Sequence, residues 1–202
     1  MMRKVVIATK NPGKAKEFEE MFSTLGYTVE TLLDHPEMSD IEETGTTFEE
    51  NSAIKATQTA KALHTLAIAD DSGLAVEALN GEPGVYSARY AGLDKDDQKN
   101  REKLLKAMEQ VPDEARAAAF HCVLTISDEN GQIIKQYHGI WDGMITRFEQ
   151  GSNGFGYDPI FYVPSEQKTA AELTQTRKDQ LSHRGQAVSQ LVRDLERGAL
   201  NL

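Results

Sequence analysis

An apolar run that passes at once into a polar turn and then an amphipathic segment constrains the fold of this chain most. Residues 5–8 are apolar but too few for a helix, and residues 9–14 include Asn, Pro and Gly. Beyond the turn, apolar side chains recur at helical spacing from Ala15 to Leu25. This order predicts a strand, a tight loop and a helix. Backbone N–H groups and the positive end of the helix dipole would meet in that loop, which suits a phosphate.

The loop also carries two lysines, Lys10 and Lys14, but it is not a Walker A motif. Ala8 stands where that motif has its first glycine, and Ala15 stands where it has Ser or Thr. A P-loop kinase or NTPase is therefore disfavoured, whereas phosphate binding stays open. The alternative is an ordinary strand–helix turn with solvated lysines.

Length, charge and cysteine content narrow the class of protein. A chain of 202 residues suits one large domain or two intimately joined lobes with a real core, and we expect a single two-lobed domain over residues 1–202. The net charge of −10 argues against a nonspecific nucleic-acid binder. A single cysteine, Cys122, excludes an internal disulfide. Because we find no signal peptide and no membrane span, we expect a cytoplasmic protein.

Periodicity along the chain predicts an α/β fold. Apolar runs predict strands at residues 5–8, 27–33, 66–69, 121–126, 132–141 and 144–148. Helical spacing predicts helices at residues 15–25, 48–63 and 94–108 and from residue 182 onward. Thr47 and Glu50 have capping-box spacing, and Asn130-Gly131 between two apolar runs indicates a hairpin. Strand–helix units around a central antiparallel hairpin indicate a mixed sheet with helices packed on it.

The acidic pair Asp70-Asp71 directly follows the strand predicted at residues 66–69. Adjacent carboxylates repel each other, so a divalent cation, basic neighbours or exposure to water must offset the cost. Magnesium held by a few carboxylates and substrate phosphates is common in phosphate chemistry. A plain turn is the alternative, because Asp, Ser and Gly are turn residues. The position of this pair directly after a buried strand favours a functional role over a plain turn.

Other polar residues are candidates for a functional site only in combination with their neighbours. Glu42 and Glu43 can add a metal ligand from a separate loop, although alone they indicate a solvated surface pair. Asn51 and Lys55 share one helix face, which alone indicates an exposed surface.

Two later segments carry aromatic rings or hydrogen-bond donors. Glycines on both sides of Phe155 allow the backbone to come close to a ligand. If that ligand is a purine, an aromatic ring of this segment can stack on it. A tight turn that buries the rings is the alternative. Ser182 is a predicted N-cap that places His183 and Arg184 in the first helical turn, where donors suit a keto oxygen or a phosphate. Basic residues there oppose the helix dipole, which disfavours a purely structural role. We assign Cys122 and Trp141 to packing.

Five segments in this order resemble the inosine triphosphate pyrophosphatase family, also called XTP/dITP diphosphatases. They are residues 8–14, 69–74, 83–89, 154–159 and 182–185, and the resemblance extends over essentially the whole chain. It implies hydrolysis of dITP, ITP and XTP to the monophosphate and pyrophosphate, which removes deaminated purines from the nucleotide pool. It also implies Mg²⁺ as cofactor, a homodimer, and a long mixed sheet that divides two lobes around a substrate cleft.

The resemblance implies a role for each matched residue. Asp71 is implied as the base, with Lys14 and Lys55 as further catalytic residues, and Glu43 and Asp71 as metal ligands. The implied substrate contacts, with the triphosphate on the first six and the nucleoside on the last seven, are Thr9, Lys10, Asn11, Pro12, Gly13, Lys14, Ser72, Phe155, Gly156, Tyr157, Asp158, Lys178, His183 and Arg184.

The chemistry of these residues agrees with that implication. Water attack at the α-phosphorus makes pyrophosphate the leaving group, whose charge Mg²⁺, Lys14 and loop amides can neutralise. Asp71 can orient and deprotonate the water, and donors such as Arg184 favour a 6-keto purine over adenine. Two alternatives stay open: a Maf-like nucleotide diphosphatase of different base preference, and a non-catalytic purine-nucleotide-binding module.

Overall fold

The computed structural model describes residues 3–200 and confirms the α/β class, with helices packed on a seven-stranded sheet in the order β2-β1-β3-β4-β5-β6-β7. The strands are β1 (Arg3–Ile7), β2 (Tyr27–Thr31), β3 (Ala67–Val76), β4 (Ala117–Ser127), β5 (Ile133–Ile145), β6 (Phe161–Val163) and β7 (Lys168–Thr169). The α-helices are α1 (Pro12–Ser23), α2 (Phe48–Leu63), α3 (Asp97–Ala107), α4 (Gln175–Leu181) and α5 (His183–Glu196). The sheet is mixed, because β1 runs parallel to β2 and β3 whereas β6 runs antiparallel to β5 and β7.

The chain forms two compact units. Unit 1 comprises Met1–Asp71, Cys122–Gly139 and Arg184–Leu202, and unit 2 comprises Ser72–His121 and Ile140–His183. Strands β3, β4 and β5 therefore each contribute residues to both units. The substrate cleft expected from the resemblance stays a prediction.

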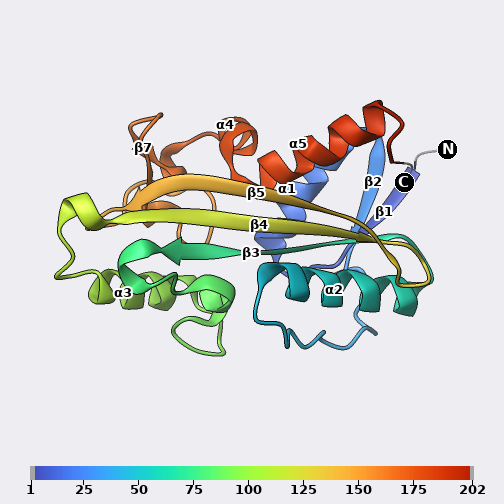
Figure 1. Cartoon of the computed structure of the whole chain (residues 1–202), viewed down its shortest axis with the longest axis horizontal. Helices are drawn as coiled ribbons and strands as arrows, with labels where there is room; N and C mark the ends of the chain where they lie inside the picture. Colours follow the sequence, from blue (N-terminus) through green and yellow to red (C-terminus); the bar gives the residue numbers. More distant parts are fainter. Residues whose placement is uncertain (1–2, 201–202) are drawn as a thin grey trace. The chain divides into compact units, whose positions relative to one another are not determined.

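Unit 1 has an apolar layer on each face of its strands. On one face, Ile7 and Ile68 pack with Phe18 of α1 and Leu191 of α5, all fully buried. On the other face, Ala69 packs with Ala56 of α2. Figure 1 shows α1 and α5 on one side of β3 and α2 on the other. Successive residues of β3 within unit 1, up to Asp71, therefore point alternately toward α1 and toward α2.

Local capping explains where the first two helices of unit 1 begin. The Asn11 side chain accepts hydrogen bonds from the N–H groups of Gly13 and Lys14, so α1 starts at Pro12. The Thr47 side chain accepts from the N–H of Glu50, as the capping-box spacing predicts, and α2 runs over the expected residues 48–63.

Unit 2 is built around aromatic rings. Phe120, Trp141 and Phe161 lie with ring centroids 4.5–6.4 Å apart. Leu104 of α3 is buried in the same core. The packing role predicted for Trp141 is confirmed, as is that of Cys122, which is buried in unit 1 where desolvation raises the pKa of its thiol to about 12.

Several sequence-based predictions of strands and helices need correction. The strand predicted at residues 66–69 continues to Val76, because Leu74 and Val76 are buried and extend its apolar side. The separate strand predicted at residues 144–148 is wrong, since β5 runs unbroken to Ile145. Strands β6 and β7 and helix α4 have three, two and seven residues, too few for periodicity to reveal. The hairpin at Asn130-Gly131 is confirmed by β4 and β5 on its two sides.

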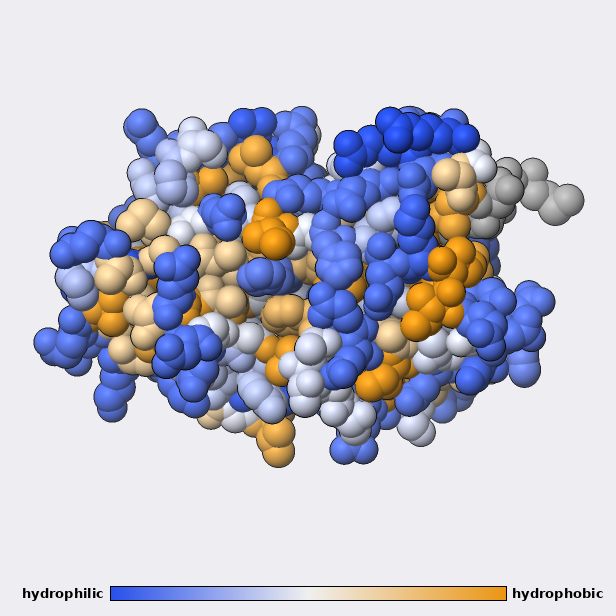
Figure 2. All heavy atoms as spheres, in the orientation of Figure 1, coloured by the Kyte–Doolittle hydropathy of each residue, from blue (hydrophilic) through white to orange (hydrophobic). Residues whose placement is uncertain are grey.

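The exposed surface agrees with the composition of the chain. On the face drawn in Figure 2, hydrophilic residues predominate and apolar ones form separate patches. Among residues 3–200, no helix has both the length and the apolar character needed to cross a membrane.

Candidate active site

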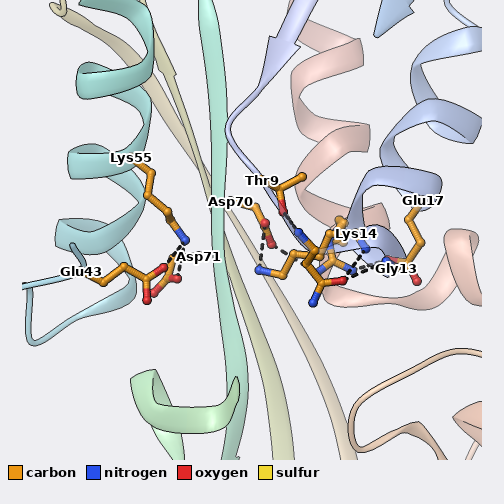
Figure 3. Close-up of polar contacts among 10 residues, drawn as sticks. Thr9, Gly13, Lys14, Glu17, Glu43, Lys55, Asp70 and Asp71 are labelled. Atoms are coloured by element: carbon orange, nitrogen blue, oxygen red, sulfur yellow. Dashed lines mark hydrogen bonds and ion pairs between the residues drawn. The ribbon is translucent and has the colours of Figure 1, made fainter. Parts of the chain in front are cut away.

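The acidic pair lies inside β3 rather than in a turn, so its two side chains point to opposite faces of the strand. Figure 3 shows Asp70 directed toward Lys14 of α1 and Asp71 directed toward Lys55 of α2. Both carboxylates are buried. Basic neighbours, one of the three ways to offset their repulsion, are present on both faces of the strand. The two residues therefore occupy two different environments, with two different chemistries.

On the α2 face, one lysine joins two carboxylates. Lys55 Nζ lies 2.7 Å from Asp71 Oδ1 and 2.8 Å from Glu43 Oε1. One turn earlier on α2, the buried Asn51 accepts a 2.8 Å hydrogen bond from the N–H of Gly45, which anchors the loop that carries Glu43. The structure thus brings together Glu43, Lys55 and Asp71, which the resemblance implies as metal ligands and catalytic residues.

Burial and charge act in opposite directions on these groups. Burial raises the pKa of Asp71 above its ordinary value, although Lys55 and Lys14 oppose the shift. Burial alone would lower the pKa of Lys55, but Asp71 and Glu43 hold it above its ordinary value, so the lysine stays charged. Asp71 Oδ1 is bound to Lys55, whereas Asp71 Oδ2 is buried and has no hydrogen-bond partner among residues 3–200. An oxygen in that state fits a cation or a water molecule.

Magnesium fits this donor set only with help from other ligands. Among residues 3–200, no group of three or more His, Cys, Asp or Glu side chains is arranged to hold a metal. Glu43 and Asp71 supply two carboxylates through their shared contact with Lys55. Mg²⁺ at phosphate-handling sites is commonly held by one or two carboxylates, waters and substrate phosphates. The chain's own residues are therefore compatible with Mg²⁺ in the presence of a phosphorylated ligand.

On the α1 face, Asp70 is the centre of a buried ion network. Its Oδ1 lies 2.9 Å from Lys14 Nζ, and its Oδ2 lies 3.2 Å from Arg184 Nη2. Arg184 Nη1 is also bound to the carboxylate of Glu17, and both residues are buried. Burial alone would raise the pKa of Asp70, but Lys14 and Arg184 hold it well below its ordinary value. Asp70 therefore remains charged and anchors Lys14 rather than acting as a base.

The first loop is closed by its own polar groups. Thr9 Oγ1 accepts a 3.1 Å hydrogen bond from the N–H of Asn11. Asn11 Oδ1 in turn accepts from the N–H groups of Gly13, at 2.9 Å, and Lys14, at 3.1 Å. The free amides expected at the start of α1 are therefore partly occupied by the helix cap. Pro12 is exposed at the first helical position.

The two lysines of this loop point to different partners. Lys10 Nζ donates to the carbonyl of Met38 and to the carboxylate of Asp40, at 2.9 and 2.7 Å. Lys14 is directed into the strand layer toward Asp70. Lys14 is therefore the lysine of the loop that lies nearest to the acidic pair.

In unit 2, the aromatic loop at residues 154–159 is held by Asp158. Asp158 Oδ2 accepts from the N–H of Phe155 at 2.9 Å and lies 2.6 Å from Lys178 Nζ. Lys178 Nζ also lies 4.9 Å from the centroid of the Phe155 ring. Tyr157 is buried and donates to the carbonyl of Ser87, so the packing alternative holds for this ring. Phe155 is only half-buried and remains the ring suited to a ligand.

The predicted pair His183 and Arg184 divides between the two units. The His183 ring stacks on Phe120 in unit 2, with centroids 4.8 Å apart and an 11° interplanar angle. Arg184 belongs to unit 1 and enters the Asp70 network. Ser72 follows Asp71 in β3 and is half-buried. The roles implied for these three residues stay predictions.

Glu17 is the main residue that sequence reasoning missed. It lies three residues after Lys14 and four before Met21, on the inward side of α1, where a carboxylate is unexpected. That position was a usable signal, because a buried carboxylate needs a cationic partner. The partner itself, Arg184, is 167 positions away and could not be read from local spacing.

Two glycines of the aromatic loop give a matched test of its geometry. Gly154 has φ +75°, and a Cβ there would overlap Asp158 Oδ2, which Lys178 and Phe155 hold in place. Gly156 has φ +61°, and a Cβ there would meet nothing within 4 Å. We expect Gly156→Ala to destabilise the fold by the left-handed backbone cost of about 1–2 kcal/mol and Gly154→Ala by clearly more. Chemical denaturation checks this, and equal losses would contradict the close approach of Gly154 to Asp158.

Comparison with known proteins decides the family. The Ham1 family profile matches residues 5–194. The chain belongs to the Ham1 family. A protein of Halalkalibacterium halodurans named dITP/XTP pyrophosphatase is 50% identical over 195 residues, which cover 96% of this chain and 100% of the relative. An Escherichia coli K12 protein of the same name is 50% identical over 200 residues, covering 98% and 100%.

A solved Ham1 structure agrees with the fold described above. The HAM1 protein from Coxiella burnetii superposes with a TM-score of 0.86 at 46% identity, covering 97% of this chain and 100% of that chain. The family resemblance drawn from the five sequence segments is therefore confirmed.

Proposed function

We propose that this Ham1 protein hydrolyses the non-standard purine nucleotides dITP, ITP and XTP to the monophosphate and pyrophosphate. Near-full-length relatives at 50% identity carry the name dITP/XTP pyrophosphatase, which supports the substrate class. The observation that carries the proposal is Asp71. It is a buried carboxylate with one oxygen on Lys55 and the other without a hydrogen-bond partner in the described part of the chain. This environment suits a group that must accept a proton.

In this mechanism Asp71 orients the attacking water and takes its proton, and its raised pKa makes it the stronger base of the acidic pair. Lys55 fixes the Asp71 side chain through Oδ1. Lys14, anchored by Asp70, contributes positive charge toward the phosphates. Glu43 and Asp71 would hold Mg²⁺. The chemistry that bound magnesium supplies is neutralisation of charge on the phosphate oxygens.

For the nucleoside end, we propose that Phe155, Lys178 and His183 contact the base. Lys178 places a cationic hydrogen-bond donor beside the Phe155 ring. Such a donor suits the keto oxygen of a 6-keto purine better than the amino group of adenine. Arg184 is a weaker candidate for that role, because it lies in the buried ion network of Glu17 and Asp70 in unit 1, whereas Lys178, although bound to Asp158, lies beside the Phe155 ring. We also propose a homodimer, as the resemblance implies, and a cytoplasmic protein without a nucleic-acid or membrane partner, as expected from the sequence.

A substrate panel tests this function. We expect dITP, ITP and XTP to be hydrolysed with kcat/KM at least about 100-fold above dATP, because a site built around donors rejects a mismatched amino group. Activity should require Mg²⁺ and disappear with a chelator. Pyrophosphate is measured by a coupled phosphate-release assay, with dUTP and TTP alongside.

The alternatives predict different results from the same panel. Higher turnover of dUTP or TTP would favour a Maf-like nucleotide diphosphatase. Binding of dITP without turnover in magnesium would favour a non-catalytic nucleotide-binding module.

A further inference from the structure

Both backbone polar groups of Gly156, in the aromatic loop, are bound by side chains of α3. Asp97 Oδ2 accepts from the N–H of Gly156 at 2.8 Å, and Arg101 Nη1 donates to its carbonyl at 2.9 Å. The two side chains lie four residues apart, on one face of the helix. An acidic and a basic residue at this spacing commonly pair with each other, but here they contact the N–H and C=O of one residue.

Neighbouring residues keep both side chains available for this contact. The N-cap role in α3 belongs to Asp96, which accepts from the N–H of Lys99, so the carboxylate of Asp97 is not needed as the cap. Arg101 Nε donates to Glu149 at 2.8 Å, and the Arg101 side chain is 14% exposed, which fixes the plane of its guanidinium.

The loop needs such support because of its backbone. Gly154 and Gly156 both have positive φ, a conformation that glycine adopts without cost but also leaves easily. Between them, Phe155 is held from inside the loop by the Asp158 carboxylate that accepts from its N–H. The contacts of Asp97 and Arg101 restrain the next residue from outside the loop. The position of the Phe155 ring therefore depends on α3 as well as on Asp158.

We propose that Asp97 and Arg101 are positioning residues that hold Phe155 ready for the purine and thereby set the affinity for the base. This inference rests on the proposed function, in which Phe155 contacts the base. A loop fixed in its bound conformation avoids the entropic cost of ordering when the ligand binds. Loss of either contact should weaken the nucleoside end of the substrate and leave its phosphate end unaffected.

The experiment compares Asp97→Ala and Arg101→Ala with the parent chain. Three readouts are used: calorimetric affinity for dIMP, KM and kcat for dITP with Mg²⁺, and inhibition by inorganic tripolyphosphate, which has no base. Asp97→Asn is the conservative variant, because its amide oxygen still accepts from the N–H of Gly156. Lys106→Ala is the matched control, an exposed residue of the same helix.

We expect each alanine variant to lose about tenfold in dIMP affinity and to raise KM for dITP by a similar factor. The reason is that each variant loses one charge-assisted hydrogen bond. Their kcat for dITP and their inhibition by tripolyphosphate should change less than about twofold. The lost binding of the base is equally strong in the ground state and in the transition state, so its loss raises KM without lowering kcat. Asp97→Asn should recover most of the affinity, and Lys106→Ala should match the parent.

Three results would overturn the positioning role. They are unchanged dIMP affinity in folded Asp97→Ala and Arg101→Ala, an equal loss for tripolyphosphate, or no recovery in Asp97→Asn. If one alanine variant fails to fold, the other and Asp97→Asn decide. Absence of dITP turnover in the parent would overturn the proposed function, whereas the dIMP affinities would still decide the role of α3.

Discussion

Replacing Asp71 by Asn is expected to lower kcat for dITP by about 1,000-fold or more, because an amide cannot take the proton of the attacking water. The fold should persist. Burial disfavours the charge of Asp71, so a neutral side chain of the same shape costs little stability. Lys55 keeps its contact with Glu43 in this variant. Steady-state kinetics and a thermal melt measure the two effects.

The neighbouring residue supplies the matched control. Asp70 has the same side chain on the opposite face of β3, and its pKa is lowered because Lys14 and Arg184 stabilise its charge. Asp70→Asn should therefore reduce stability in addition to displacing Lys14. If Asp71→Asn and Asp70→Asn lose the same stability and the same activity, the division of roles between the two faces of β3 is wrong.

Replacing Arg184 by Ala is expected to destabilise the protein by about 3–5 kcal/mol, because the change leaves Glu17 and Asp70 buried beside one cation fewer. For a chain of this size that loss lowers the melting temperature by roughly 10 °C. Denaturation in urea measures it directly.

A double variant separates lost charge balance from lost packing. Glu17→Gln with Arg184→Met removes the pair together and keeps much of its volume, so it should be less destabilising than Arg184→Ala alone. A base-contact role for Arg184 makes a different prediction: unchanged stability, with dITP weakened more than tripolyphosphate. That outcome would contradict the ion network as the main role of this residue.

The sequence predicted the elements whose signals are local. The strand, loop and helix at the N-terminus, the start of α2 at its Thr47 cap and the hairpin at Asn130-Gly131 all depend on residues within one or two turns of each other. Hydrophobic periodicity and capping chemistry act over that distance. The extension of β3 through Asp70-Asp71 could not be predicted in this way. Its buried carboxylates are tolerated because cationic side chains from α1, α2 and α5 reach them.

For the candidate site, the sequence predicted which residues to consider but not how they are arranged. Lys14, Lys55, Glu43 and Asp71 were identified together, and the structure places them in one unit. The separation of Asp70 from Asp71 follows from the two-residue period of a strand, once β3 is known to include both. The contacts of α3 with Gly156 join residues 55 and 59 positions apart, so no local spacing reveals them.

Product analysis of dITP hydrolysis by the parent chain and Asp71→Asn tests the central claim most directly. With Mg²⁺, the parent should release dIMP and pyrophosphate in equal amounts. Asp71→Asn should bind dIMP normally and release about 1,000-fold less pyrophosphate per unit time. Release of dIDP and orthophosphate by the parent, or parent-like turnover by Asp71→Asn, would contradict the account.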